Sequence, residues 1–374
     1  MKIEIPGLKN AWLRMARAED NEALLSIFQN VPMRGNLVLA TERGPDFQSL
    51  YEMQGATTWC WVIELDGQIE GLGSFLIRDG WMNEQKKRVG YLGDLRVTKK
   101  ARGILAKVFG QAYAIVREQE NCHDFITSVL ASNAKALHAL TKRSESRKSQ
   151  PRYDLYRYFD AVQIQFQRRS KKTSKNLEVQ IAQEDDLEDL IAFLSDEHRQ
   201  RPFGYRFDCG EFENRLKNWP GFGLEKTYLV RDGGVLKGLC TAWDAAVVKR
   251  YRVLLWRGRM KFLRFVHNLL SKVSRSPSLP KSGDCFRYFY LANLTIKDQD
   301  PAVLEALLRS IYNDYRKQSY HFFTLYMEEN SPLNRALSTF SVRRLPFQLY
   351  SVHQPQEAKR YDNGNTCGFE MALA

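Results

Sequence analysis

The sequence of 374 residues lacks any long hydrophobic run. No stretch approaches the roughly 18 uninterrupted apolar residues of a membrane-spanning helix. The first residues, Met1 to Pro6, also lack the basic and then apolar pattern of a secretion signal. These two absences predict a cytoplasmic protein without a membrane span.

Cysteine and histidine are few and scattered. None of the six cysteines forms a pair with CxxC or metal-ligand spacing, so we expect free thiols in a reducing compartment. The six histidines are dispersed as well, and no cluster of His, Cys and carboxylate residues indicates a metal. The sequence therefore predicts neither a disulfide framework nor a metal site.

Acidic residues are fewer than basic residues. There are 56 Lys and Arg residues against 43 Asp and Glu residues, which gives a net charge of +13. Such an excess favours anionic partners: a nucleotide cofactor, an acidic carrier protein, nucleic acid or an anionic membrane surface. A solvated basic face without a dedicated partner is an equal alternative, because no nucleic-acid-binding motif accompanies the charge.

The chain is too long for one core, and it partly repeats itself. A single core rarely exceeds roughly 250–300 residues, so two domains are expected. Two Asp-Gly pairs at Asp66 and Asp232 each predict a hairpin turn. Other segments recur in the same order. The matching segments are residues 18–28 with 183–194, residues 91–97 with 290–296, and residues 127–140 with 324–337.

The spacing between matching residues changes once along the chain. This change indicates a single insertion in the second copy, at about 249–281, whose apolar residues from Met260 to Leu270 have helical spacing. A polar, basic run at 169–176 has nothing to bury and predicts a linker. We therefore expect domains at 1–168 and 177–374, both with mixed α/β structure.

The segment from Tyr91 to Phe109 carries the clearest sign of a binding site. Apolar residues up to Val97 predict a buried strand, and an apolar stripe from Ile104 predicts a helix. A basic turn with one glycine, Gly103, joins them. Free backbone N–H groups and the helix dipole favour an anion such as phosphate at this kind of helix N-terminus.

This segment resembles the acyl-CoA signature of the GNAT acyltransferase superfamily. Leu95-Arg96-Val97 is followed by Arg102-Gly103, and the later strand from Phe125 is followed by Ser132-Asn133. The resemblance covers residues 10–168 and, in a degenerate second copy, 177–374. It implies a tandem GNAT protein with acetyl-CoA or another acyl-CoA as cofactor.

The resemblance also implies which residues hold that cofactor. Backbone groups of the strand would hold the thioester and pantetheine, the turn and first helical residues would cradle the pyrophosphate, and an asparagine would contact the pantetheine arm. Asn133 can equally be a plain helix cap. The implied cofactor-binding residues are Leu95, Arg96, Val97, Lys100, Arg102, Gly103, Ile104, Leu105, Ala106, Lys107 and Asn133.

The sequence departs from the family pattern at two positions. Leu105 stands where the family loop has a second glycine, and its side chain could crowd the pyrophosphate. Leu140-Thr141 stands where the family often has a tyrosine that protonates the leaving thiolate. Either another tyrosine acts, Tyr153 or Tyr156 with Tyr153 preferred, or the thiolate leaves unassisted.

Asp94 is the candidate general base, because it lies just before the implied thioester-binding positions. The alternative is a structural carboxylate paired with Arg96 or a loop lysine. In the second copy Asn293, which cannot act as a base, stands at the matching position. Two acids and a proline in the run 297–301 also disfavour phosphate there, so we expect the first copy to be the active one.

The leading functional hypothesis is an N-acetyltransferase that acts on a primary amine of a small or amino-acid-like acceptor. Residues 31–47 are expected to line the acceptor pocket. An acyltransferase that uses acyl carrier protein or aminoacyl-tRNA is the second enzyme hypothesis, and a catalytically silent GNAT-fold binding protein is the third. Acceptor, acyl length and oligomeric state stay open, with a homodimer as one arrangement.

Overall fold

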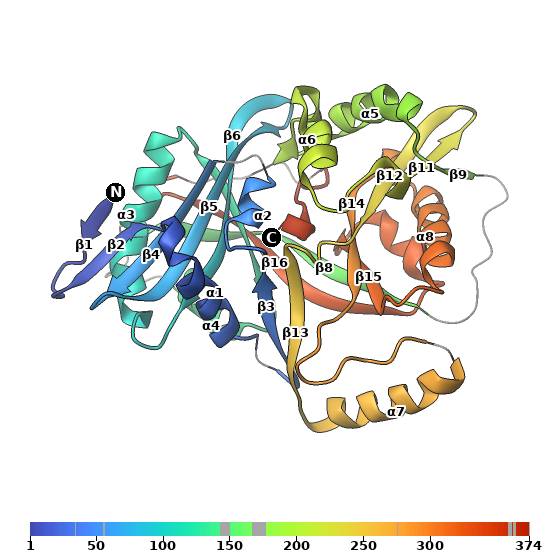
Figure 1. The fold of residues 1–374 in the computed structure, drawn as a ribbon. Helices are drawn as coiled ribbons and strands as arrows, with labels where there is room; N and C mark the ends of the chain where they lie inside the picture. The colour runs from blue at the N-terminus through green and yellow to red at the C-terminus, as the bar shows by residue number, and fades with distance from the viewer. Residues whose placement is uncertain are drawn as a thin grey trace.

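The computed structural model describes residues 1–33, 35–54, 57–142, 150–166, 177–274, 276–357, 361 and 364–373. One long mixed sheet carries helices on its faces (Figure 1), which confirms the predicted α/β class. The linker predicted at 169–176 lies outside the described residues. No helix within the described ranges is long and apolar enough to cross a membrane.

The strands run through both halves of the chain. In order, they are β1 (Lys2–Glu4), β2 (Ala11–Met15), β3 (Leu37–Arg43), β4 (Thr57–Leu65), β5 (Gln68–Met82), β6 (Gln85–Val97), β7 (Asp124–Leu130), β8 (Arg152–Gln165), β9 (Glu178–Ile181), β10 (Gly204–Tyr205), β11 (Thr227–Asp232), β12 (Val235–Trp243), β13 (Lys249–Trp256), β14 (Tyr288–Ile296), β15 (Phe322–Glu328) and β16 (Val342–His353).

The helices alternate with these strands. The α-helices are α1 (Asn21–Asn30), α2 (Ser49–Glu52), α3 (Arg102–Gln119), α4 (Ala134–Thr141), α5 (Leu187–Arg199), α6 (Glu211–Asn218), α7 (Gly258–Ser274) and α8 (Pro301–Tyr315). The short 3-10 turns include η1 (Ala18–Asp20), η3 (Glu184–Asp186), η7 (Pro332–Leu337) and η8 (Met371–Leu373).

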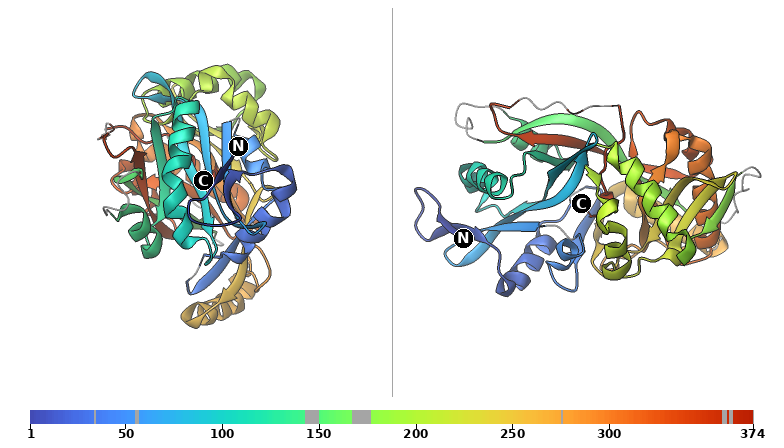
Figure 2. Two further views of the ribbon diagram at one scale, coloured as in Figure 1. Left: turned by 90° about the vertical axis from the view of Figure 1, so that its left-hand side faces the viewer. Right: turned by 90° about the horizontal axis from the view of Figure 1, so that it is seen from above.

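The two halves of the sheet exchange their last long strands. The strand order is β1-β2-β4-β5-β6-β7-β16-β8-β15-β14-β12-β11-β9. Strand β16 pairs with β7 of the first half, and β8 pairs with β15 of the second half. Strands β8 and β16 also pair with each other along their lengths, and the view from above shows them crossing between the halves (Figure 2). The exchange joins both halves through backbone hydrogen bonds.

The repeat in the sequence corresponds to repeated local structure. Both Asp-Gly hairpins are present, and positive φ angles occur at Asp66 and Gly67 in one and at Gly233 in the other. The helix starts match too. Asp20 accepts a bond from the N–H of Arg17, as Asp186 does from Gln183. Satisfying free N–H groups in this way fixes where each first helix begins.

The region predicted as an insertion contains β13 and helix α7, and the helix agrees with its sequence spacing. Strand β13 leaves the main sheet and pairs antiparallel with β3 of the first half. Helix α7 lies at the periphery of the molecule (Figure 1).

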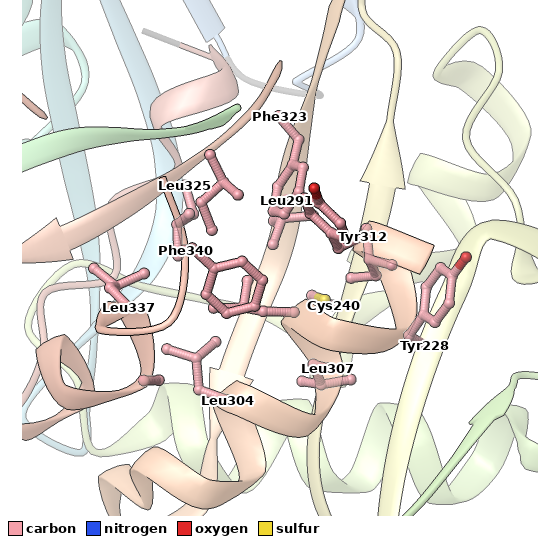
Figure 3. Packing of buried hydrophobic residues seen from close by; sticks show 14 of the residues in the cluster. Tyr228, Cys240, Leu291, Leu304, Leu307, Tyr312, Phe323, Leu325, Leu337 and Phe340 are labelled. Atoms are coloured by element: carbon pink, nitrogen blue, oxygen red, sulfur yellow. The ribbon is translucent and has the colours of Figure 1, made fainter. Parts of the chain in front are cut away.

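Each half has its own buried core next to its long helix. In the first half the core lies beneath α3 and includes Val108, Val116 and Phe125. In the second half, Leu304 and Leu307 of α8 pack against strands β14 and β15. Phe323 and Leu325 of β15 face the helix (Figure 3). In each core, every second residue of the strands packs against the apolar stripe of the helix, as expected for α/β packing.

Candidate active site

The strand, turn and helix predicted around residues 91–109 are β6 and α3. The turn is tied back to the sheet, since Lys100 Nζ and Thr98 Oγ1 both bond to the carboxylate of Glu70, at 2.7 and 2.5 Å. Lys100 is largely exposed, and its hydrogen bond to Glu70 raises its pKa. The turn therefore places an ion pair of Lys100 and Glu70 near the start of α3.

The N-terminus of α3 is open to an anion, whereas that of α8 is closed. Ala101 caps α3 without a side-chain bond, and the first turn contains no acid. At α8, Asp300 accepts a bond from the N–H of Ala302 at 2.8 Å, and Pro301 has no N–H. Free N–H groups and a basic side chain favour phosphate at α3 only.

Strands β6 and β7 begin side by side and then diverge. They pair in parallel only from Val89 to Tyr91 against Asp124 to Ile126. Beyond that point Thr127 uses its hydroxyl to bond the carbonyl of Leu92 at 2.7 Å. Within the described residues, the later part of β6 is not paired with β7, and the space between the two strands beside α3 is called the opening below.

A β-bulge interrupts β6 within this opening. Leu72 pairs with Arg96 and Ser74 with Gly93, so Asp94 and Leu95 lie opposite Gly73 alone. Asp94 has a φ of 55°, a left-handed conformation that is rare outside glycine, asparagine and aspartate. A bulge of this kind re-aims backbone and side-chain groups next to a site.

Solved structures share the overall fold. No protein-family model and no curated protein sequence matches the chain. An N-myristoyltransferase from Saccharomyces cerevisiae matches with a TM-score of 0.59 at 10% identity, over 99% of this chain and 87% of that chain. A GCN5-related N-acetyltransferase from Sphaerobacter thermophilus matches with a TM-score of 0.53 at 10% identity, over 92% and 95%.

A third solved structure agrees. A GCN5-related N-acetyltransferase from Anabaena variabilis matches with a TM-score of 0.52 at 10% identity, over 92% of this chain and 73% of that one. The chain has the GNAT fold. At such low identity these likenesses concern the fold, and the roles of individual residues must be argued from the site itself.

The GNAT signature residues occupy three positions around the opening. Leu95 is among the exposed hydrophobic residues, and Arg96 places its guanidinium 4.9 Å from the ring centre of Phe28. Arg102, Gly103 and Lys107 are exposed in the first turns of α3, whereas Ile104 is buried beneath them. Ala106 belongs to the same helix, and its side chain lies outside the described part of the chain.

Leu105 and Asn133 are both accounted for by local packing. The Leu105 side chain is partly buried and packs against the core under α3. Asn133 caps α4 by accepting a bond from the N–H of Ala136 at 3.2 Å. This is the helix-cap alternative, and the side-chain N–H₂ group of Asn133 is not engaged by that bond.

Asp94 lies in a buried network that the sequence analysis did not anticipate. Its carboxylate accepts bonds from Arg43 on β3 at 2.6 and 2.8 Å, and from the hydroxyl of Tyr51 on α2 at 2.5 Å. Burial by itself would raise the pKa of Asp94, but the charge of Arg43 and the Tyr51 hydrogen bond outweigh it and lower that pKa. The carboxylate of Asp94 is thus paired with Arg43 and not, as the structural alternative expected, with Arg96 or a loop lysine.

Tyr153 lies on β8 beneath α3. Its ring stacks on that of Phe109, with 6.5 Å between the ring centres. Burial raises the pKa of Tyr153, so the phenol keeps its proton at neutral pH. Tyr156, the second candidate, packs instead against Phe203 and Tyr361 on the second-half side.

Three residues near the bulge carried no local sequence signal. Arg43, Tyr51 and Lys249 come from β3, α2 and β13, and Lys249 pairs with Arg43 in the β13–β3 register. Burial lowers the pKa of Lys249 to about 7, with further lowering by Arg43 and Arg96. Lys249 joins this group through the pairing of β13 with β3, which involves residues 37–43 of the predicted acceptor segment.

Proposed function

We propose that this protein is an acyl-CoA-dependent N-acyltransferase whose donor binds in the first half. The observation that carries the proposal is the divergence of β6 and β7 beside the uncapped, basic N-terminus of α3. The opening offers backbone groups to a thioester and pantetheine, and the helix end offers N–H groups to a pyrophosphate. The closed N-terminus of α8 leaves the second half without this combination.

In this proposal a neutral amine attacks the thioester carbonyl of the donor. A C–N bond forms, a backbone N–H of the β6 bulge stabilises the oxyanion, and the C–S bond then breaks to release CoA thiolate. Tyr153 remains the proposed source of the proton for the thiolate and regains that proton from solvent; burial raises the pKa of its phenol, which makes it a weaker acid than an exposed tyrosine. The amide product keeps the acyl group, and CoA leaves as the thiol.

Asp94 has a positioning role in this proposal. Its carboxylate already accepts three hydrogen bonds and its pKa is lowered, so it is a poor proton acceptor. Held by Arg43 and Tyr51, it fixes the bulge whose backbone meets the thioester. The acceptor amine then loses its proton to solvent or to another group of the pocket.

The donor in the proposal is acetyl-CoA, and the acceptor is a primary amine of a small or amino-acid-like molecule. The yeast N-myristoyltransferase structure contains myristoyl-CoA, which makes a longer acyl group the first alternative. Donors carried by acyl carrier protein or tRNA are the second alternative, because both are polyanionic and would suit the charge of +13.

Calorimetric titration with acetyl-CoA, myristoyl-CoA and free CoA tests the proposal. We expect binding in the micromolar range that Arg102→Glu weakens at least tenfold, because the variant reverses charge at the open end of α3. Lys317→Glu, an equal charge reversal on an exposed residue beyond α8, should leave the affinity unchanged. Absence of binding to all three ligands would refute the CoA donor and direct the search to carrier-protein donors or a silent binding protein.

A further inference from the structure

The second half contains a cavity of about 300 Å³ that the acyl-transfer proposal does not use. It opens where β14 and β15 diverge, since these strands pair only from Tyr288 to Tyr290 against Phe322 to Thr324. Residues of α5, α6 and the C-terminal segment before η8 complete its walls. Its size suits a small molecule.

Two features prevent this cavity from holding CoA as the first half would. The carboxylate of Asp300 and the ring of Pro301 close the phosphate end at α8. At the bulge of β14, the N–H of Asn293 donates to the carboxylate of Glu370 at 3.0 Å. The N–H that could meet a thioester there is already occupied, so the ligand of this cavity is a different molecule.

The cavity wall has buried hydrogen-bond donors without partners. The Arg215 side chain is 1% exposed; its Nε bonds to Glu211 and its Nη1 to the Asn293 side-chain oxygen. Within the described part of the chain, Nη2 of Arg215 and Nδ2 of Asn293 have no hydrogen-bond partner. Leaving a buried donor without a partner is unfavourable, and more so when the donor is charged. Both residues line the cavity, which makes their unpartnered donors candidates for contact with an anionic ligand atom.

Acidic groups lie on the same wall. Glu197 of α5 lines the cavity, and its nearest cation is Arg201 at 3.7 Å. Glu370 lines it from the C-terminal segment, 3.6 Å from Arg215. Burial raises the pKa of both carboxyl groups above the ordinary value, which means that their positive neighbours do not fully compensate for lost hydration. A positively charged group on the ligand would stabilise the ionised form of these two carboxyl groups.

We propose that this second-half cavity binds a small amino-acid zwitterion, with its carboxylate on Arg215 and Asn293 and its ammonium near the acidic side chains. Tyr205, Phe207, Leu291 and Leu294 supply apolar wall for a side chain. The unpartnered donors favour a carboxylate on the ligand, and the two carboxyl groups in the cavity wall, Glu197 and Glu370, favour an amine. This inference stands apart from the donor site and does not depend on acyl transfer.

Binding is tested by thermal shift and calorimetry with the twenty standard amino acids. For each amino acid that binds, the primary amide removes the carboxylate charge and the des-amino acid removes the ammonium. We expect at least one amino acid to bind and each analogue to bind at least tenfold more weakly. No shift with any amino acid, or equal binding of amide and acid, would overturn the inference.

Two variants test whether the amino acid binds in this cavity. Asn293→Asp should satisfy Arg215 with its own carboxylate, as Asp94 does for Arg43 in the first half, and should abolish binding. Leu294→Trp should abolish it by filling the cavity without a change of charge, so failure of one variant to fold leaves the other. Asn218→Asp, exposed on the same helix as Arg215, is the control with unchanged affinity. Binding that survives in a folded Asn293→Asp or Leu294→Trp variant would overturn the assignment.

A separate observation concerns helix α7, which presents an uncovered apolar face. The large side chains Phe262, Leu263, Phe265, Leu269 and Leu270 are each more than half exposed. The opposite face is held by the segment before β14, through bonds from Arg264 to the carbonyl of Pro280 and between Asn268 and Leu279. The helix is therefore fixed to the protein with its apolar side outward.

The charged residues in the sequence of α7 are all basic. Arg257, Arg259 and Lys261 are exposed at the start of the helix, and residues 257–275 contain no acidic side chain. An amphipathic helix with aromatic and leucine residues on one face and basic residues beside them is suited to the headgroup region of a bilayer. Charge complementarity selects anionic headgroups.

We propose that α7 docks the protein on an anionic membrane surface, with Phe262 and Phe265 inserted among the headgroups. Sedimentation with vesicles of phosphatidylcholine, with and without 30% phosphatidylserine, tests this. We expect binding to the anionic vesicles at least tenfold above the neutral ones, and loss of it in the Phe262→Ser, Phe265→Ser double variant. Val235→Ser, exposed in the β11–β12 hairpin, is the control and should bind normally.

Two results would overturn the membrane assignment. One is an absence of sedimentation with anionic vesicles. The other is a dimer in solution that the double variant converts to a monomer, because the apolar face would then be covered by a second copy.

Discussion

Replacement of Arg43 by methionine is expected to lower the free energy of unfolding by about 3–5 kcal/mol, because it leaves the carboxylate of Asp94 buried without a counter-ion. The Arg43 side chain is 2% exposed, so water cannot take its place. Methionine retains much of the contact with Phe28 and Phe47, which the guanidinium now faces. The loss should be seen as a lower urea midpoint of unfolding, followed by tryptophan fluorescence.

Two comparisons isolate the charge. Arg17→Met removes an exposed arginine that lies 3.5 Å from Glu19, and it should change the unfolding free energy by less than about 1 kcal/mol. Adding Asp94→Asn to Arg43→Met removes the unpaired charge and should restore more than half of the loss. If the double variant is as unstable as Arg43→Met alone, packing and not charge explains the effect.

Leu307→Ala should destabilise the second half by about 2–5 kcal/mol, through lost burial and the cavity that remains. Leu307 is 0% exposed on α8 and packs in the core with Leu304, Phe323 and Leu325 (Figure 3). The expected result is a lower thermal midpoint by calorimetry. Because β8 pairs with β15, we expect the first half to lose stability in the same transition.

The matched control is Leu263→Ala, the same substitution at a leucine that is 52% exposed on α7. In the absence of vesicles it should change the unfolding free energy by no more than about 0.5 kcal/mol. Separate transitions for the two halves in Leu307→Ala would contradict the coupling that we expect from strand exchange.

Local sequence patterns predicted the repeated elements well. The Asp-Gly turns, the acid at each first helix start and the apolar stripe of α3 are set by backbone and side-chain preferences within a few residues. The difference between the basic, uncapped start of α3 and the closed start of α8 could also be predicted. Each helix start is determined by a few consecutive residues.

The hydrogen-bond partners of Asp94 could not be predicted from local sequence patterns. Its partners Arg43 and Tyr51 lie on β3 and α2, and neither position stands out in the sequence. Lys249 comes from the second half through the pairing of β13 with β3. The cavity around Arg215 likewise depends on Glu370 near the end of the chain.

The sequence by itself thus determined the mixed α/β class, the internal repeat and the contrast between the two helix starts, because these depend on short-range hydrogen bonding and periodic burial. Only the tertiary structure decided the exchange of β8 and β16, the partner of Asp94 and the position of the second-half cavity. These features depend on pairing between strands that are distant in sequence, and that pairing is set by how the whole apolar surface is buried.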